Sequence, residues 1–276
     1  MELDESQAIF ELLDDKVQVS GTKKYLKFLL LLAFIIVAII LVGASFIAII
    51  TPRLKIKEFN ELYSQGIHST KNGPGFYDSS FYALKKEEAF LKSKLAKSDL
   101  DSISLSINVP DSLLSLEIKG IAIYNIKIDR IKLSPIFNSL DKDAILHCFS
   151  LPFKINSQYA TVVKEPIVIK QAPKDTIEAN QAAPNIDTLK PKMVAYYFCL
   201  DKDIILDIRQ SEKTELIPYY KYLLRYNYWN TARQLKEVSN FRLPDYTPWI
   251  QIEINCKDAL ALYRALPNSA IISIHL

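Results

Sequence analysis

The stretch from Phe28 to Ile50 constrains this chain most, because it runs for 23 residues without a charge. At about 1.5 Å per residue, a helix of this length measures about 34 Å, enough to cross a hydrocarbon core of roughly 30 Å. A backbone inside lipid must satisfy its own polar groups, and a single segment does so as a helix. We therefore predict a transmembrane helix at 28–50, with the lipid bilayer as its partner.

Two other interpretations fit this run less well. A secretory signal peptide has a shorter apolar region followed by a cleavage site with small residues. Here the apolar run begins only after 27 residues that contain six acidic side chains. A buried core helix is the second alternative, but 23 uncharged residues are unusual for one.

The orientation of the segment rests on the lengths of its two flanks. Basic residues lie close to both ends: Lys16, Lys23, Lys24, Lys27, Arg53, Lys55 and Lys57. Because this distribution is nearly even, the positive-inside rule decides little. A short polar tail most simply stays in the cytoplasm, so we predict the inner (cytoplasmic) membrane, with residues 1–27 inside and the C-terminal domain periplasmic or otherwise extracytoplasmic. Residues 1–24 are expected to be mostly disordered, with a short cytoplasmic helix as the alternative.

Composition excludes several classes of function. The chain has 276 residues and a net charge of +3, without the run of Lys and Arg that a nucleic-acid partner would need. Three cysteines (Cys148, Cys199 and Cys256) do not form a disulfide framework, although one pair could form after translocation. CxxC and HExxH motifs are absent, and the six glycines form no phosphate-binding loop. We therefore predict neither a metal nor a cofactor.

Residues 51–100 are predicted to form a helical juxtamembrane stalk. The first helix should continue out of the membrane until the breaker sequence KNGPG at 71–75. A second helix should begin at Ser79–Ser80, which are good N-cap residues. Its apolar face would hold Phe81, Leu84, Leu91 and Leu95. We expect this face to pack on the chain's own domain, with packing on a partner as the alternative.

From Asp101 onward the apolar period changes from 3.6 to 2. Ile103, Leu105, Ile107 and Val109 alternate with polar residues and predict a half-buried strand. Turn signals at 110–112 and at Lys119-Gly120 separate it from two further alternating segments, so 101–129 should form an antiparallel meander. More apolar runs follow at 145–170, where Pro166 would mark an edge or a bulge.

The second half of this domain carries four further signals. Residues 172–191 hold three prolines and are predicted to be a flexible surface loop. A hairpin should follow, turning at Asp201-Lys202-Asp203. The tyrosine-rich segment 216–242 should be partly helical, its tyrosines packing in the core rather than stacking on a sugar or a base. Asn255 should cap a helix that precedes a last strand. The fold class is thus a membrane-anchored α+β protein with a mainly antiparallel domain at 101–276.

Two segments together resemble one family of bacterial cell-wall enzymes. Residues 102–133, ISLSINVPDSLLSLEIKGIAIYNIKI and its flanks, are similar to the opening strands of the YkuD-type L,D-transpeptidase domain. Residues 249–276, with INCKDALALYRALPNSAIISI, are similar to its closing helix and strand. Enzymes of this family attack a peptidoglycan stem peptide with a cysteine thiolate that a nearby histidine activates. The resemblance implies the same fold for the domain.

The resemblance also implies where the catalytic motif has been lost. Anchored on Asp258-Ala259, it places the family's cysteine at Gln251, its histidine at Trp249 and its arginine at Glu253. Trp249, Gln251 and Glu253 are therefore candidates for a degenerate pocket. Cys256 is a weak nucleophile candidate, because a helix N-terminus favours a lowered thiol pKa.

The expected role is therefore non-catalytic. The domain would bind peptidoglycan or hold wall-associated envelope proteins close to the membrane. A second hypothesis is a single-pass subunit of an envelope secretion or motility complex, in which the anchor and the stalk make the main contacts. The third hypothesis, an active cysteine L,D-transpeptidase, has little support in the residues that occupy the motif.

Overall fold

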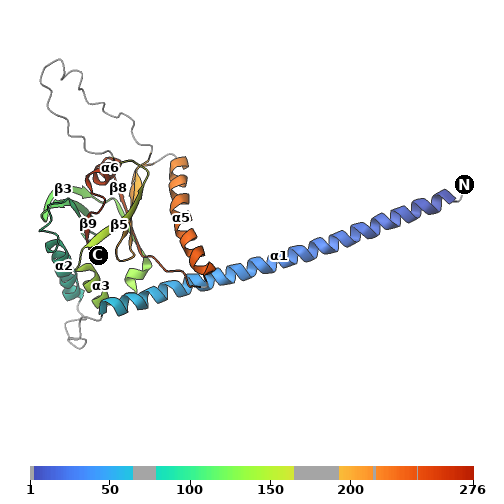
Figure 1. Cartoon of the computed structure of the whole chain (residues 1–276), viewed down its shortest axis with the longest axis horizontal. Coiled ribbons are helices and arrows are strands. Elements are labelled where there is room, and N and C mark those ends of the chain that lie inside the picture. Colours follow the sequence, from blue (N-terminus) through green and yellow to red (C-terminus); the bar gives the residue numbers. More distant parts are fainter. Residues whose placement is uncertain (1–2, 65–78, 165–192, 214–215, 241) are drawn as a thin grey trace, which may run out of the picture. The chain divides into compact units, whose positions relative to one another are not determined.

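The computed structural model describes residues 3–64, 79–164, 193–213, 216–240 and 242–276, with the backbone alone for 3–26, 64, 216, 229 and 230. The chain divides into two compact units, residues 1–53 and 54–276. The second unit contains the sheet together with residues 54–100, so all but the first three residues of the stalk expected at 51–100 belong to the same compact unit as the sheet. Figure 1 gives the elements and their labels.

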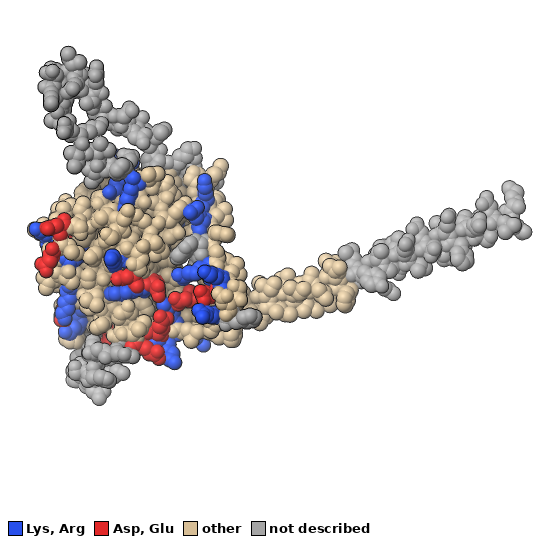
Figure 2. Space-filling model, in the orientation of Figure 1, with Lys and Arg blue, Asp and Glu red and all other residues tan. Residues whose placement is uncertain are grey.

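Helix α1 (Leu3–Ser64) contains the whole apolar run. Large apolar side chains are exposed along it, for example Phe34 at 74% and Val42 at 70%. Among the described residues this is the one helix long and apolar enough to cross a membrane, by length and composition. The visible side of the run is free of charged atoms in Figure 2. From Leu3 onward the disorder expected for residues 1–24 is not found, and the short cytoplasmic helix given as the alternative is instead the start of one continuous helix.

In the part of the second unit that the structure describes, nine strands form one mixed, mostly antiparallel sheet. Its order is β3-β2-β1-β9-β5-β6-β7-β8-β4, with β1–β9 and β7–β8 as the parallel pairs. The strands are β1 (Ser104–Asn108), β2 (Leu113–Ile118), β3 (Ile121–Lys127), β4 (Arg130–Leu133), β5 (Phe153–Ala160), β6 (Ala195–Leu200), β7 (Ile205–Gln210), β8 (Trp249–Ile254) and β9 (Ile271–His275).

The predicted meander is confirmed as β1-β2-β3. Its second turn consists of Lys119 and Gly120, both with positive φ (52° and 75°). Two consecutive residues in this conformation make the tight turn that suits the twist of a hairpin, and glycine adopts it without a steric penalty. The predicted hairpin β6–β7 is also present, with Asp203 at positive φ in its turn.

The two ends of the sheet are consecutive in the chain. Only Ile128 and Asp129 separate β3 from β4, although these strands stand at opposite ends of the strand order. The Ile128 amide donates to Ser112 beside β2, and the Asp129 amide donates to Glu253 on β8. The sheet is therefore so strongly curved that its ends meet at this corner, as in sheets whose strands switch partners at a bend.

One face of the sheet carries the main core. It includes Leu105 and Ile107 of β1 and Ile272 and Ile274 of β9, all fully buried. The helices α3 (Lys142–Phe149) and α6 (Cys256–Ala265) and the 3-10 turn η2 (Pro135–Asn138) pack into the same core. The predicted N-cap of α6 is confirmed, because the Asn255 side chain accepts a hydrogen bond from the Asp258 amide.

The opposite face of the sheet is covered at two places. Helix α2 (Ser79–Leu95) covers β1 and β9, where Ser93 hydrogen-bonds Ser273 at 2.9 Å. Helix α5 (Leu216–Ser239) covers β6 and β7 and is longer than the sequence predicted. Because α2 and the turn after it cover β1, its serines Ser104 and Ser106 are buried too. The prediction that this strand is half-buried is wrong for that reason.

The prediction for the packing face of α2 is also wrong. Its buried residues are Ala89, Phe90 and Ser93. The four apolar residues expected to pack on the domain are exposed instead: Phe81 at 38%, Leu84 at 63%, Leu91 at 55% and Leu95 at 71%. The helix start at Ser79 is as predicted.

The remaining expectations concern the middle of the chain. The first of the apolar runs noted at 145–170 lies in helix α3, which spans residues 142–149. Of the tyrosines in 216–242, Tyr222 is buried in a second, smaller core under α5, whereas Tyr220 and Tyr228 are exposed. The breaker sequence at 71–75, the strand break at Pro166 and the loop at 172–191 lie outside the described residues.

Candidate functional site

The three pocket candidates on β8 share the face of the strand that points away from the main core. Ile250, Ile252 and Ile254 are fully buried, whereas the alternating Trp249, Gln251 and Glu253 are partly exposed. This follows from the period of two along a strand. The three candidates therefore lie in a row on one surface of the sheet.

The row divides into two environments. Trp249 packs against the small core under α5. Gln251 donates a hydrogen bond to Glu253 at 3.1 Å, and Glu253 forms a salt bridge of 3.2 Å with Arg130 on β4. The structure thus brings Gln251 and Glu253 together and keeps Trp249 in an apolar contact.

The neighbouring strands complete this row with polar residues. On β7, Asp207 pairs in register with Gln251, and Arg209 pairs with Glu253. Glu253 therefore has an arginine neighbour on each side, Arg209 on β7 and Arg130 on β4. Arg130 pairs with Glu253 and Arg209 pairs with Asp207, so the two guanidinium groups and the two carboxylates of this row balance in charge.

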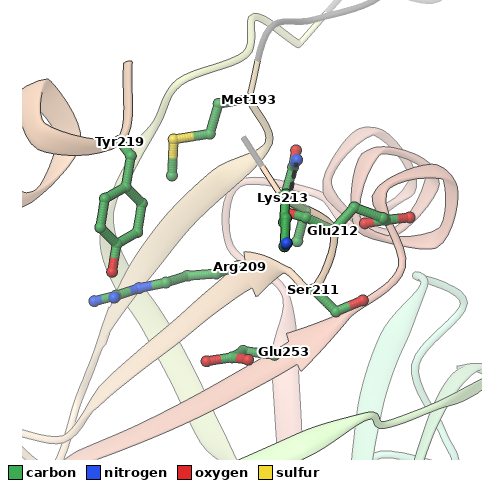
Figure 3. Close-up of a pocket in the computed structure, with 8 residues that line it drawn as sticks. Met193, Arg209, Ser211, Glu212, Lys213, Tyr219 and Glu253 are labelled. Atoms are coloured by element: carbon green, nitrogen blue, oxygen red, sulfur yellow. Dashed lines mark hydrogen bonds between the residues drawn. The ribbon is translucent and has the colours of Figure 1, made fainter. Parts of the chain in front are cut away.

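A pocket of about 380 Å³ opens where β7 ends. Figure 3 shows Arg209 beside Tyr219 of α5, with Glu253 beneath it and Lys213 across the opening. The lining residues are Met193, Arg209, Gln210, Ser211, Glu212, Lys213, Tyr219 and Glu253. Both signs of charge line it, together with one aromatic and one methionine side chain. Such a lining suits a small group that carries a charge of each sign, such as part of a peptide.

Arg209 is fixed in this pocket by a buried network. Its Nε donates to Asp207 Oδ2 at 2.9 Å, and Tyr222 donates to Asp207 Oδ1 at 2.7 Å. Burial acts to lower the pKa of Arg209, but the hydrogen bond and the charge of Asp207 outweigh it and the pKa is raised. Burial raises the pKa of Tyr222, and the negative charge of Asp207 adds to this effect. These groups keep Arg209 charged and hold it in place.

Cys256 lies at the start of α6, but its thiol is not activated there. Its backbone amide donates to both carboxylate oxygens of Glu212, at 2.9 and 2.8 Å. The helix N-terminus, which could stabilise a thiolate, thus already holds an anion. Burial raises the pKa of the Cys256 thiol, and the charge of Glu212 raises it further. The expectation of a lowered thiol pKa at this position is therefore wrong.

The other two cysteines are unsuited to nucleophilic chemistry as well. Cys148 is fully buried in the main core, and burial raises the pKa of its thiol to about 12. Burial also raises the pKa of Cys199. All three cysteines are free thiols, so the pairing left open by the sequence is not found. Within the described ranges, His, Cys, Asp and Glu form no cluster that could hold a metal ion.

The sequence missed most of the pocket. Met193, Arg209, Glu212, Lys213 and Tyr219 line it without having been predicted as site residues. One signal was present: Asp207 and Arg209 alternate with the buried Ile208 and so occupy the outer face of β7. Their contact with β8 depends on a parallel pairing between segments about 40 residues apart, which periodicity alone does not reveal.

Comparisons with family models, with curated proteins and with solved structures find no match to this chain. The resemblance to the L,D-transpeptidase domain therefore stays a prediction.

Proposed function

We propose that this chain is a single-pass membrane protein whose second unit is a non-catalytic scaffold that holds another envelope protein close to the membrane. The anchor is the uncharged run from Phe28 to Ile50 in α1. The second unit lies on the extracytoplasmic side, because the short polar tail stays in the cytoplasm. The scaffold role is proposed because apolar side chains of α2 and β3 in the second unit are exposed.

The observation that carries the scaffold role is the outer face of α2. Leu84, Leu91 and Leu95 are each more than half exposed, and together with Phe81 they lie on the side of the helix opposite its buried residues. An apolar stripe of this kind matches the groove-binding faces of helices that dock on partner proteins. The stripe lies on the stalk segment, to which the second sequence hypothesis, a subunit of an envelope complex, assigned the main contacts together with the anchor.

The edge strand β3 extends the same surface. Its first residues follow Gly120, where a Cβ atom would lie 3.5 Å from the Ser98 side chain just after α2. Ile121 is 71% exposed and Ile123 is 54% exposed. Because β3 stands at one end of the strand order, it offers an edge with apolar side chains to which another chain can add a strand.

Peptidoglycan is the second candidate ligand, and the pairing of the strands favours it. The two segments that resemble the L,D-transpeptidase domain adjoin each other in one sheet, through β1–β9 and β4–β8. The pocket with Arg209, Lys213 and Glu253 lies beside β8. A stem peptide carries both carboxylate and amino groups, which fit a lining of both charges.

Photocrosslinking in intact cells tests both candidates with the full chain. p-Benzoylphenylalanine would replace Leu84 or Leu91 on α2 and Tyr219 in the pocket, with exposed Val163 as the matched control. We expect the probes at Leu84 and Leu91 to give an adduct with the same protein, and the probe at Val163 to give none. In a chain that carries the probe at Leu91, the additional substitution Leu84→Glu should remove this adduct. An adduct at Tyr219 that only a muramidase releases would identify wall binding. Efficient incorporation without an adduct at Leu84 and Leu91 contradicts the scaffold role.

A further inference from the structure

Helix α5 has two apolar faces, and among the described residues one of them packs against the sheet. Its inner face places Tyr219, Tyr222, Leu223 and Tyr226 against the second core, which includes Met193, Ala195, Tyr197 and Ile205. The residues of the outer face are all exposed: Ile217 at 82%, Tyr220 at 57%, Leu224 at 68%, Tyr228 at 76%, Leu235 at 63% and Val238 at 42%.

The outer residues form a continuous stripe. At about 100° per residue, all six lie within about 80° of the helix circumference. From Ile217 to Val238 the stripe extends about 32 Å at roughly 1.5 Å per residue. Single exposed apolar residues are ordinary on a protein surface, but a row of six along one helix face indicates a binding surface.

The charges of α5 indicate what this surface binds. Lys221, Arg225 and Lys236 are exposed on one flank of the stripe, and Glu237 is the one acidic residue between Ile217 and Ser239. Basic residues beside an apolar stripe are typical of helices that lie in the interface of a membrane with anionic lipids. Tyr220 and Tyr228 within the stripe also suit the headgroup region, because each has an apolar ring and a polar hydroxyl.

The position of α5 in the second unit fits the same partner. Arg233 in its second half donates to Thr247 and to the backbone oxygen of Asp245 at 3.5 Å. The Asp245 carboxylate accepts from Lys55 Nζ at 3.3 Å, and Lys55 is itself 3% exposed. Lys55 follows Ile50, the last residue of the apolar run, by only five positions. If residues 28–50 span a bilayer, the chain leaves it only a few residues before the contact between Lys55 and Asp245.

We infer that α5 rests on the membrane surface, with its outer stripe at the boundary between headgroups and acyl chains. Lys221 and Lys236 face anionic headgroups, and their aliphatic stems lie along the apolar surface. Arg225, whose guanidinium lies 4.5 Å from the centroid of the Tyr159 ring, adds positive charge on the same flank. This inference rests on the membrane anchor of the proposed function. The second unit then has two points of attachment to the bilayer, the anchor and α5, which together fix its orientation on the membrane.

Lipid photolabelling of the full chain tests this placement. The chain is reconstituted in vesicles of phosphatidylethanolamine and phosphatidylglycerol (about 7:3) that contain an alkyne-tagged lipid. p-Benzoylphenylalanine is placed at Leu224, at Tyr228, at Ile39 in the anchor, or at exposed Asn268 as the control. We expect lipid adducts at Leu224, Tyr228 and Ile39 and none at Asn268. Replacing phosphatidylglycerol with phosphatidylcholine should lower labelling at Leu224 roughly fivefold or more, while labelling at Ile39 stays constant.

The outcomes separate the two proposals. Lipid adducts at Ile39 without any at Leu224 and Tyr228 overturn the surface placement of α5 and leave the anchor standing. A missing adduct at Ile39 contradicts the anchor itself. Adducts at Leu224 that join two copies of the chain identify a dimer contact and also overturn the placement. The combined change of Lys221, Arg225 and Lys236 to Gln should reproduce the effect of removing the anionic lipid; unchanged labelling contradicts the role of these charges.

Discussion

Replacing Glu117 with glutamine is expected to lower the free energy of unfolding by about 3–5 kcal/mol, because it removes one partner of a buried ion cluster. Glu117 on β2 is fully buried and lies 2.8 Å from Lys94 Nζ and 3.1 Å from Lys97 Nζ. Lys97 is 1% exposed and also donates to the Leu105 carbonyl oxygen and to Ser106. Without the carboxylate, the buried Lys97 ammonium would be left with neutral groups and with the like charge of Lys94.

The measurement is chemical denaturation of the full chain in detergent micelles, followed by tyrosine and tryptophan fluorescence. Glu88→Gln is the matched control, because Glu88 pairs with Lys85 and Lys92 on the exposed side of α2. The control should leave the free energy of unfolding nearly unchanged, since exposed ion pairs contribute little. Equal losses in the two variants would contradict the role assigned to the buried cluster.

The same cluster predicts how stability depends on pH. Burial lowers the pKa of Lys97 to about 8, against the opposing effect of Glu117. The unfolded chain therefore binds more protons than the folded chain between about pH 8 and 10.5, and the Lys97 contribution to stability increases over this range. Burial acts to raise the pKa of Glu117, but Lys94 and Lys97 outweigh it, so the pKa is lowered. The stabilisation by this carboxylate is complete above about pH 4.5 and is lost as the pH falls through its folded pKa.

The double substitution of Ile36 and Ile40 with lysine is expected to abolish stable membrane insertion. Two lysines near the centre of a transmembrane helix cost about 5–7 kcal/mol on insertion scales. Both positions lie inside the uncharged run. The wild-type chain should stay in the membrane pellet after alkaline extraction, whereas most of the double variant should leave it.

The control for this variant carries the same added charge outside the run. Ser20→Lys with Thr22→Lys adds two lysines before Phe28. This chain should remain in the pellet, because positive charge that flanks an apolar segment outside the hydrocarbon core is tolerated. If the Ile36 and Ile40 variant also remains there, the run is not what attaches the chain.

The local elements of the fold could be predicted from the sequence, because each has its own signal. The Lys119-Gly120 turn, the Asn255 cap and the Ser79 helix start all depend on residues within one turn of the chain. The pairing of β9 with β1 was not predictable in this way, because the two strands are about 165 residues apart and the pattern of each fits several partners.

The packing faces were harder to predict than the elements. Helix α2 has leucines on one side and buries the side that holds Ala89, Phe90 and Ser93. Hydrophobic periodicity favours burial of the leucine side. However, Ser93 hydrogen-bonds Ser273 on β9, and Lys97 just after the helix donates to Ser106 on β1, so the opposite side of the helix faces the sheet. The buried serines of β1 have the same explanation. A polar residue in an alternating strand is assigned to solvent unless its polar partner on another element is known.

The candidate site shows a similar limit. The row of Trp249, Gln251 and Glu253 follows from strand alternation, and Glu253 does line the pocket. The pocket itself required residues from β7, α5 and the segment after β7, which the parallel β7–β8 pairing assembles. Burial raises the pKa of the Cys256 thiol, and the charge of Glu212, which comes from 44 residues away, raises it further, so the shift is opposite to the expected one.

The central claim is that a single transmembrane helix at 28–50 places the second unit outside the cytoplasm. Impermeant maleimide labelling of the full chain tests it most directly, with Lys127→Cys on exposed β3 and Ser20→Cys in the tail. In intact spheroplasts, Lys127→Cys should be labelled above the wild-type background and Ser20→Cys should not. In inverted membrane vesicles the pattern should be reversed. Labelling of Lys127→Cys in inverted vesicles only, or of both positions from one side, would contradict the account.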